Sequence, residues 1–101
     1  MLYQISWSIY PEHKVACNKI FASMNEEDDK KDAGDKIRMV GRWHVLGGGK
    51  GVCICETDDD KALASWMQNW QGMCEITVVP VIEDEDARLI IRSKLPNDEN
   101  V

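Results

Sequence analysis

Arg42, His44 and Glu56 could do chemistry together, because they flank the glycine-rich turn within GRWHVLGGGKGVCICET, residues 41–57. A histidine held near a carboxylate is oriented and has its pKa biased, as general acid-base catalysis and anion binding both require. The structural alternative is a set of cross-strand ion pairs, which contribute about 0.2–1 kcal/mol each and need no ligand. We predict that the three residues bind a ligand, with His44 as the candidate catalytic residue.

Further side chains could complete such a site. Ser6 and Ser8 alternate with apolar residues on the first strand, so their hydroxyl groups are predicted to lie on the polar face of the sheet. Trp43 or Trp7 could bring an aromatic wall to the edge of a pocket. The predicted ligand-binding set is Arg42, Trp43, His44, Glu56, Ser6 and Ser8.

The register of the hairpin decides whether Glu56 joins the other two residues. Strict alternation over residues 36–45 predicts one face with Ile37, Met39, Gly41, Trp43 and Val45, and another with Arg38, Val40, Arg42 and His44. If His44 pairs with Val52, Glu56 shares the face of Arg42 and His44; if it pairs with Cys53, Glu56 turns towards the helices. A carboxylate beneath helices costs several kcal/mol, so the first register is favoured.

The elements that must position these residues follow from hydrophobic periodicity. Residues 2–9 alternate as a strand, and Pro11 then opens a helix that is predicted to run to about Asn25. The charged run at 26–36 has no apolar period and is predicted to be an exposed connection. Strands at 36–45 and 51–57 follow, joined by the glycine turn.

The second half begins with another helix. Thr57 or Asp58 can cap it, and its apolar stripe consists of Leu63, Trp66, Met67 and Trp70. Residues 74–82 form a fourth strand that is apolar on both faces, which predicts burial on two sides. A final helix is predicted within DEDARLIIRSKL, followed by a loose tail at 96–101.

The resulting order, β-α-β-β-α-β with an extra C-terminal helix, predicts an α+β protein of ferredoxin-like fold with a four-stranded antiparallel sheet. Residues 1–95 form one domain. Both helices of this fold cover one face of the sheet, so the other face must meet solvent, the last helix or a second copy. The apolar fourth strand favours a homodimer.

Composition limits the partners. The net charge of −6 and the lack of a basic stripe argue against nucleic acid. Apolar runs are too short to span a membrane and the N-terminus lacks a signal-peptide pattern, so we expect a cytoplasmic protein. The four cysteines are expected to be reduced packing residues, since the Cys53-x-Cys55 spacing does not suit zinc. We expect no metal and no cofactor.

Several motifs taken together resemble the small family described as domain of unknown function 3303: GRWH, the glycine turn, ETDD, the helix ending W…NW, the close V.PV..D, and the early W…PEH. The resemblance extends from Leu2 to about Asp86, and the chain departs from it in its longer acidic connection and its extra C-terminal segment. That family is similar to the dimeric α/β barrel superfamily, in which two ferredoxin-like sheets face each other and can enclose a pocket. The resemblance implies relatives that include cofactor-independent monooxygenases, haem-degrading enzymes and stress-responsive proteins.

Three functions remain open at this point. The first is a homodimer that binds a small organic metabolite, neutral or anionic, in a pocket on the open sheet face. The second is a cofactor-independent monooxygenase-like or isomerase-like enzyme that uses His44 as acid or base. The third is a structural or interaction module without a ligand.

Overall fold

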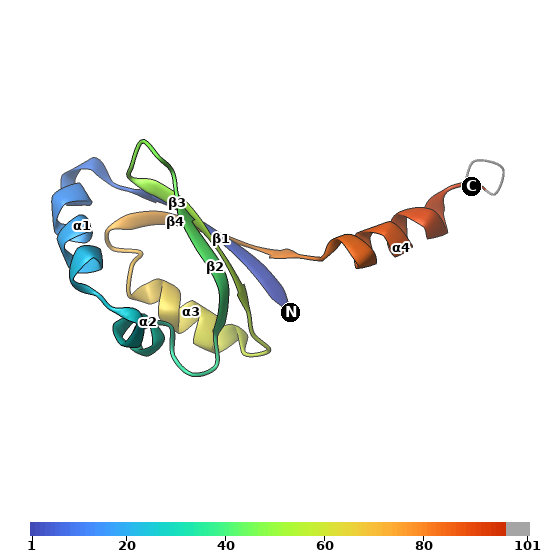
Figure 1. The fold of residues 1–101 in the computed structure, drawn as a ribbon, viewed down its shortest axis with the longest axis horizontal. Coiled ribbons are helices and arrows are strands. Elements are labelled where there is room, and N and C mark those ends of the chain that lie inside the picture. Colours follow the sequence, from blue (N-terminus) through green and yellow to red (C-terminus); the bar gives the residue numbers. More distant parts are fainter. Residues whose placement is uncertain (97–101) are drawn as a thin grey trace.

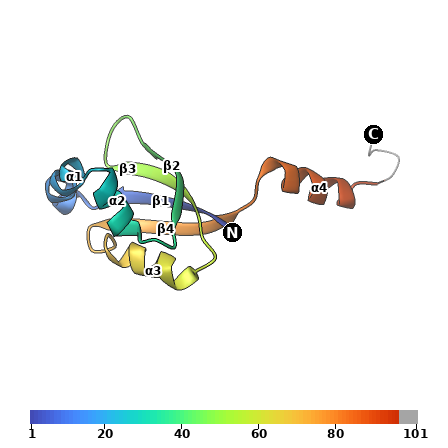
Figure 2. The ribbon, with the colours of Figure 1, turned by 60° about the horizontal axis from the view of Figure 1, so that its bottom comes forward.

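The computed structural model describes residues 1–96 and confirms the ferredoxin-like α+β fold. Four antiparallel strands form one sheet in the order β2-β3-β1-β4, with bounds β1 (Leu2–Ile9), β2 (Arg38–His44), β3 (Lys50–Glu56) and β4 (Cys74–Val81). Helices α1 (Lys14–Ser23), α2 (Glu26–Ala33) and α3 (Asp60–Gln68) lie over the same face of this sheet, and the other face is bare (Figures 1 and 2).

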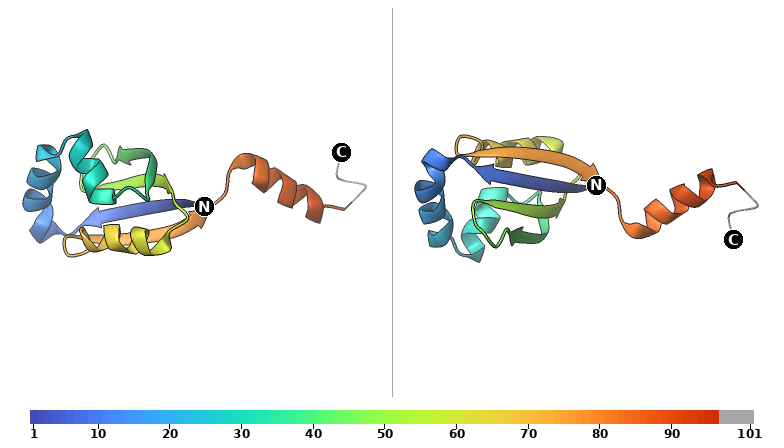
Figure 3. Two further views of the ribbon diagram at one scale, coloured as in Figure 1. Left: turned by 90° about the horizontal axis from the view of Figure 1, so that it is seen from below. Right: turned by 90° about the horizontal axis from the view of Figure 1, so that it is seen from above.

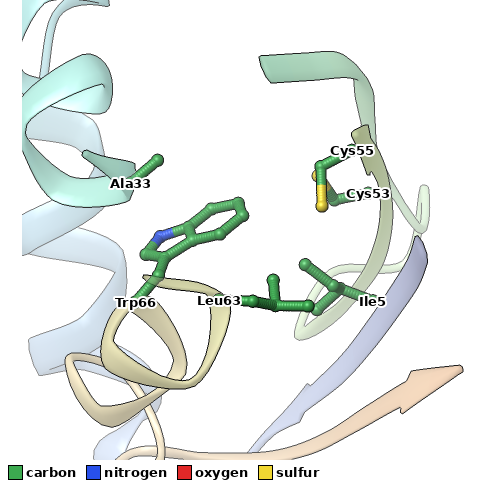
Figure 4. Close-up of a cluster of buried hydrophobic side chains, with 6 residues drawn as sticks. All are labelled: Ile5, Ala33, Cys53, Cys55, Leu63 and Trp66. Atoms are coloured by element: carbon green, nitrogen blue, oxygen red, sulfur yellow. The ribbon is translucent and has the colours of Figure 1, made fainter. Parts of the chain in front are cut away.

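The core lies between the sheet and these helices. Ile5 of β1 is buried, and its neighbours on β3 that face the same way are Cys53 and Cys55. The indole of Trp66 and the side chain of Leu63 reach this layer from α3, and Ala33 closes it from α2 (Figure 4). The apolar face of β1 and the apolar stripe of α3 therefore pack against each other, as their periodicities predict.

The first helix begins with a short 3₁₀ turn, η1 (Pro11–His13), before α1. The cap of α3 lies slightly later than predicted: the Asp59 side chain accepts a hydrogen bond from the Ala62 amide at 3.0 Å. The buried Thr57 hydroxyl instead accepts from the Asp59 amide at 3.0 Å and donates to the Lys36 carbonyl at 2.8 Å. Thr57 therefore ties the end of β3 to the segment that leads into β2.

The prediction of an exposed connection over residues 26–36 is wrong, because most of it is the helix α2. Asn25 and Asp28 form a reciprocal capping box, in which each side chain accepts a hydrogen bond from the backbone N–H of the other. Acids fill the first turn and lysines the last, as the helix dipole favours. The helix needs no apolar stripe because Ala33 is its only buried side chain.

The predicted faces of β2 are also wrong beyond Met39. Val40 is an extra residue in this strand, since Met39 pairs with Cys55 while Gly41 pairs with Ile54. This β-bulge reverses the alternation, because one added residue sends every later side chain to the opposite face. His44 pairs with Gly51, so neither predicted register is formed.

The chain beyond the sheet differs from the rest. Within the single chain β4 is not covered on both faces, because Val79 is 39% exposed and Val78 36% exposed; burial by a second copy stays a prediction. Helix α4 (Asp84–Lys94) is formed as predicted, but it projects away from the body of the domain (Figure 3). Most of the predicted tail, residues 97–101, lies outside the described residues. None of the helices described, α4 included, is long and apolar enough to cross a membrane.

Candidate small-molecule site

A cavity of about 220 Å³ lies between the sheet and the helices. Four aromatic side chains line it: Trp7 from β1, Phe21 from α1, Trp66 from α3, and Trp70 just after α3. Arg42 and His44 also line it, from the end of β2. Pockets for drug-sized molecules span about 300–1,000 Å³, so this cavity fits something smaller.

Asp32 on α2 fixes part of the aromatic wall. Its Oδ2 atom accepts hydrogen bonds from the indole N–H groups of Trp66 at 2.9 Å and of Trp70 at 2.7 Å. Its Oδ1 atom accepts from the Asn69 side-chain amide at 3.0 Å. One carboxylate thus satisfies two indole donors and holds both rings in place.

Arg42 brings a positive charge to the same cavity. Its side chain is only 18% exposed, and its guanidinium carbon lies 4.7 Å from the centre of the Phe21 ring, in cation–π geometry. Nη2 lies 3.1 Å from Oδ1 of Asp29 on α2. That oxygen is buried and accepts no hydrogen bond, so the contact is an ion pair without hydrogen-bond geometry.

His44 lies at the rim of the cavity and is exposed on one side. Its ring packs edge-on against Trp7 with centres 5.5 Å apart, and is tilted against Phe21 at 5.0 Å. Within residues 1–96 no carboxylate forms a hydrogen bond or ion pair with it. Contacts with these two aromatic rings position the imidazole.

The predicted cluster of Arg42, His44 and Glu56 is therefore not formed. The bulge turns Arg42 and His44 towards the helices, whereas Glu56 lies on the open face and pairs with Arg38, whose Nη2 is 2.9 Å from Glu56 Oε1. The expectation of a shared face assumed unbroken alternation along β2, and Val40 breaks it.

The other predicted residues also lie on the open face. Ser6, Ser8 and Trp43 line a wider, more open hollow of about 450 Å³ there, together with Val52 and Thr77. Trp43 is 56% exposed. The structure thus divides the predicted site residues between the two faces of the sheet, and His44 and Trp7 line both hollows.

The cysteines of the cavity wall are free thiols. The pKa of Cys53 is raised from its ordinary value of 9.0 to about 11, by burial first and then by neighbouring Cys55, while Arg42 opposes the shift. The pKa of Cys74 is likewise raised to about 11, by burial first and then by contact with Cys17. At neutral pH these thiols are protonated, so they act as apolar lining and not as nucleophiles.

Sequence reasoning missed Asp29 and Asp32, because both lie in the charged run that was predicted to be a connection. The signal that could have found them is Asn25-x-x-Asp28 followed by acids and then lysines, which is typical of a capped helix. Residues 29 and 32 of such a helix are three apart and share one face.

Fold and cavity together define a class: a small α+β protein of ferredoxin-like fold, with a cavity between the sheet and its helices that four aromatic side chains help to line. The chain belongs to the family described as Domain of unknown function (DUF3303), whose sequence profile matches residues 1–95. The match continues beyond Asp86 and includes α4, so this C-terminal segment is part of the family and not an addition to it.

Solved structures are similar in fold. An antibiotic biosynthesis monooxygenase has a TM-score of 0.51 at 14% identity, covering 82% of this chain and 100% of its own. Rv0793 from Mycobacterium tuberculosis has a TM-score of 0.49 at 14% identity, and the alignment covers 82% of this chain and 96% of Rv0793. A putative antibiotic biosynthesis monooxygenase from Deinococcus radiodurans has a TM-score of 0.47 at 12% identity, and the alignment covers 82% of this chain and 94% of that protein. At such identities likeness establishes the fold alone. A search of curated proteins finds no match.

Proposed function

We propose that this domain binds a small organic anion with a planar apolar body in the cavity between the sheet and the helices. Arg42 is the anion anchor, and His44 contributes at the rim. The observation that carries the proposal is a guanidinium, 18% exposed, that faces an aromatic cavity and makes no hydrogen bond within residues 1–96. Five N–H donors in a fixed fork match a carboxylate or a phosphate.

The aromatic wall supports a planar ligand. Trp7, Phe21 and the two indoles fixed by Asp32 offer flat apolar surfaces, against which a ring stacks or packs edge-on. The cavity is formed within one chain, so binding does not require the open face of the sheet.

Asp29 supports an anionic ligand. It already places a carboxylate next to Arg42, but without a hydrogen bond, so a ligand anion can replace it and gain the hydrogen bonds that Asp29 lacks. Asp29 then competes with the ligand for Arg42.

Binding of benzoate, compared with neutral benzyl alcohol, tests this proposal through tryptophan fluorescence. Asp29→Asn removes the competing charge, so we expect it to bind benzoate about tenfold more tightly, or about 1.4 kcal/mol, with benzyl alcohol unchanged. Arg42→Gln should lose the preference for benzoate. Native mass spectrometry of the purified protein would identify any ligand that remains bound.

Two results would count against this assignment. If Asp29→Asn alters the affinity for both probes equally, Asp29 does not compete for an anion site. If neither probe binds and nothing co-purifies, the structural-module interpretation is favoured instead.

The catalytic alternative uses His44. Its exposed imidazole touches both solvent and the cavity, as a group that moves a proton between them must. Once a ligand is identified, its conversion by the wild type but not by His44→Gln, with the ligand affinity unchanged, would support this role.

A second copy of the chain is the proposed partner. The open face supports this, because Trp43 is 56% exposed and Val79 39% exposed, beside the serines of the wide hollow. Two such faces could cover each other in an isologous dimer. The open-face residues Ser6, Ser8 and Trp43 then serve the dimer, or a second ligand held by it.

A further inference from the structure

Helix α4 is set apart from the body of the domain, as all ribbon views show (Figures 1, 2 and 3). The molecule measures 57 × 30 × 20 Å and has a radius of gyration of 17.1 Å. A compact domain of this length has a radius of about 13 Å. The excess comes from α4, which stands apart from the sheet and from the other described helices (Figures 1 and 3).

Such a helix is not stable by itself. It has 11 residues, and isolated helices shorter than about 12–15 residues are marginal in water. Its apolar residues Leu89, Ile90 and Ile91 are 57%, 54% and 57% exposed. Ile82, just before it, is 56% exposed. Its stability therefore requires a surface that covers these side chains.

The charge pattern identifies that surface. Asp84, Glu85 and Asp86 fill the first turn of α4, and Arg92 and Lys94 lie in its last turn. Two copies of this helix placed antiparallel bring the acids of one beside the bases of the other at both ends. A twofold axis perpendicular to the helices produces this arrangement.

We propose that α4 is a dimerisation arm that packs antiparallel against α4 of a second copy of this chain. The inference rests on the dimer proposed above and adds to it a second contact, beside that of the open sheet faces. Each helix is only about 16 Å long, which is too little for a standard interface of about 800 Å² per partner. The exposed end of β4, with Val79 and Ile82, supplies further apolar area to the same contact.

Charge reversal tests the antiparallel contact. An acid-reversed variant carries Asp84→Lys, Glu85→Lys and Asp86→Lys, and a base-reversed variant carries Arg92→Glu and Lys94→Glu. Like charges then meet in each homodimer, so sedimentation velocity should show dimerisation weakened at least about tenfold for each variant alone. A one-to-one mixture should restore the dimer, and native mass spectrometry should show heterodimers.

The mixture also controls for helix stability. Reversed charges oppose the helix dipole, but a helix that merely fails to form would not be rescued by mixing. The four tryptophans all lie outside α4, so unchanged near-ultraviolet circular dichroism of both variants would show that the body remains folded.

Each other outcome overturns the inference in a distinguishable way. A wild-type chain that is monomeric at tens of micromolar removes both the dimer and the arm. Variants that dimerise like the wild type leave a dimer formed by the open sheet faces and remove only the arm. A monomer that pellets with phosphatidylserine vesicles would assign the apolar face of α4 to a membrane surface.

Discussion

Asp32 connects two helices through a single side chain. Its carboxylate on α2 accepts hydrogen bonds from both cavity indoles, Trp66 and Trp70. Without it, two half-buried N–H donors would lack partners, and a buried unsatisfied donor costs about 1–3 kcal/mol. The residue holds the cavity wall without contributing to the apolar core.

We therefore expect Asp32→Ala to lower the free energy of unfolding by about 1–3 kcal/mol. Urea unfolding followed by tryptophan emission measures this change. Asp35→Ala is the matched control, since Asp35 is an exposed acid of the same segment and should change stability by less than about 0.5 kcal/mol. Equal effects of the two substitutions would contradict the role given to Asp32.

Arg42 and His44 show what residue types alone can predict. Both were identified as ligand-binding candidates from their chemistry, and both line the cavity. Their partners could not be foreseen, because Arg42 pairs with Asp29 and His44 packs against Phe21, in segments remote in sequence. The type of a residue indicates its chemistry, but only the fold decides what it meets.

Among the elements, β2 shows the limit of periodicity. The strand itself was predicted, since its residues suit a sheet, but the bulge at Val40 leaves no mark in the hydrophobic pattern. Val40 is apolar and 50% exposed, so it reads like any strand residue. For α2 the opposite holds, because capping and charge order indicate a helix where hydrophobicity indicates none.

The pairing of β1 with β3 depends on a glycine. Gly51 lies opposite Trp7, and a Cβ atom added there would collide with the Trp7 ring and lie 2.7 Å from the Trp43 carbonyl oxygen. The glycine therefore leaves the space that the Trp7 ring occupies beside the backbone of β3.

Gly51→Ala should therefore displace Trp7 and destabilise the fold by about 1–3 kcal/mol, as overpacking does. Thermal unfolding measures the loss, and Gly47→Ala in the adjacent turn is the control, because open space surrounds that position. A Gly51→Ala variant as stable as the control would show that the strands can adjust.

The molecule as a whole has a small core in which cysteine is prominent. Half of the buried apolar residues described are the four cysteines, the others being Ile5, Ala33, Leu63 and Trp66.

The order of elements along the chain was sufficient to predict the ferredoxin-like topology, because few topologies satisfy short connections and one covered face. The detachment of α4 could not be predicted, since its sequence is amphipathic whatever it packs against.

The buried cysteine thiols of the core predict that the free energy of unfolding decreases at alkaline pH. The pKa values of Cys53 and Cys74 rise from 9.0 to about 11 on folding, and that of Cys55 is raised as well. The unfolded chain releases these protons first, so stability is fully present below about pH 9 and falls towards pH 11. The urea midpoint measures this slope, and Cys53→Ala should make it shallower. A midpoint that stays level over the window would contradict the burial of these thiols.

Helix α2 has a further consequence, which concerns kinetics. It is held over the cavity by Asp29, Asp32 and little hydrocarbon, since Ala33 is its only buried residue. Lifting α2 breaks these polar contacts and exposes little apolar surface of the helix itself. The polar contacts therefore contribute most of the free-energy barrier to opening. A molecule bound in the cavity would then leave faster at higher ionic strength.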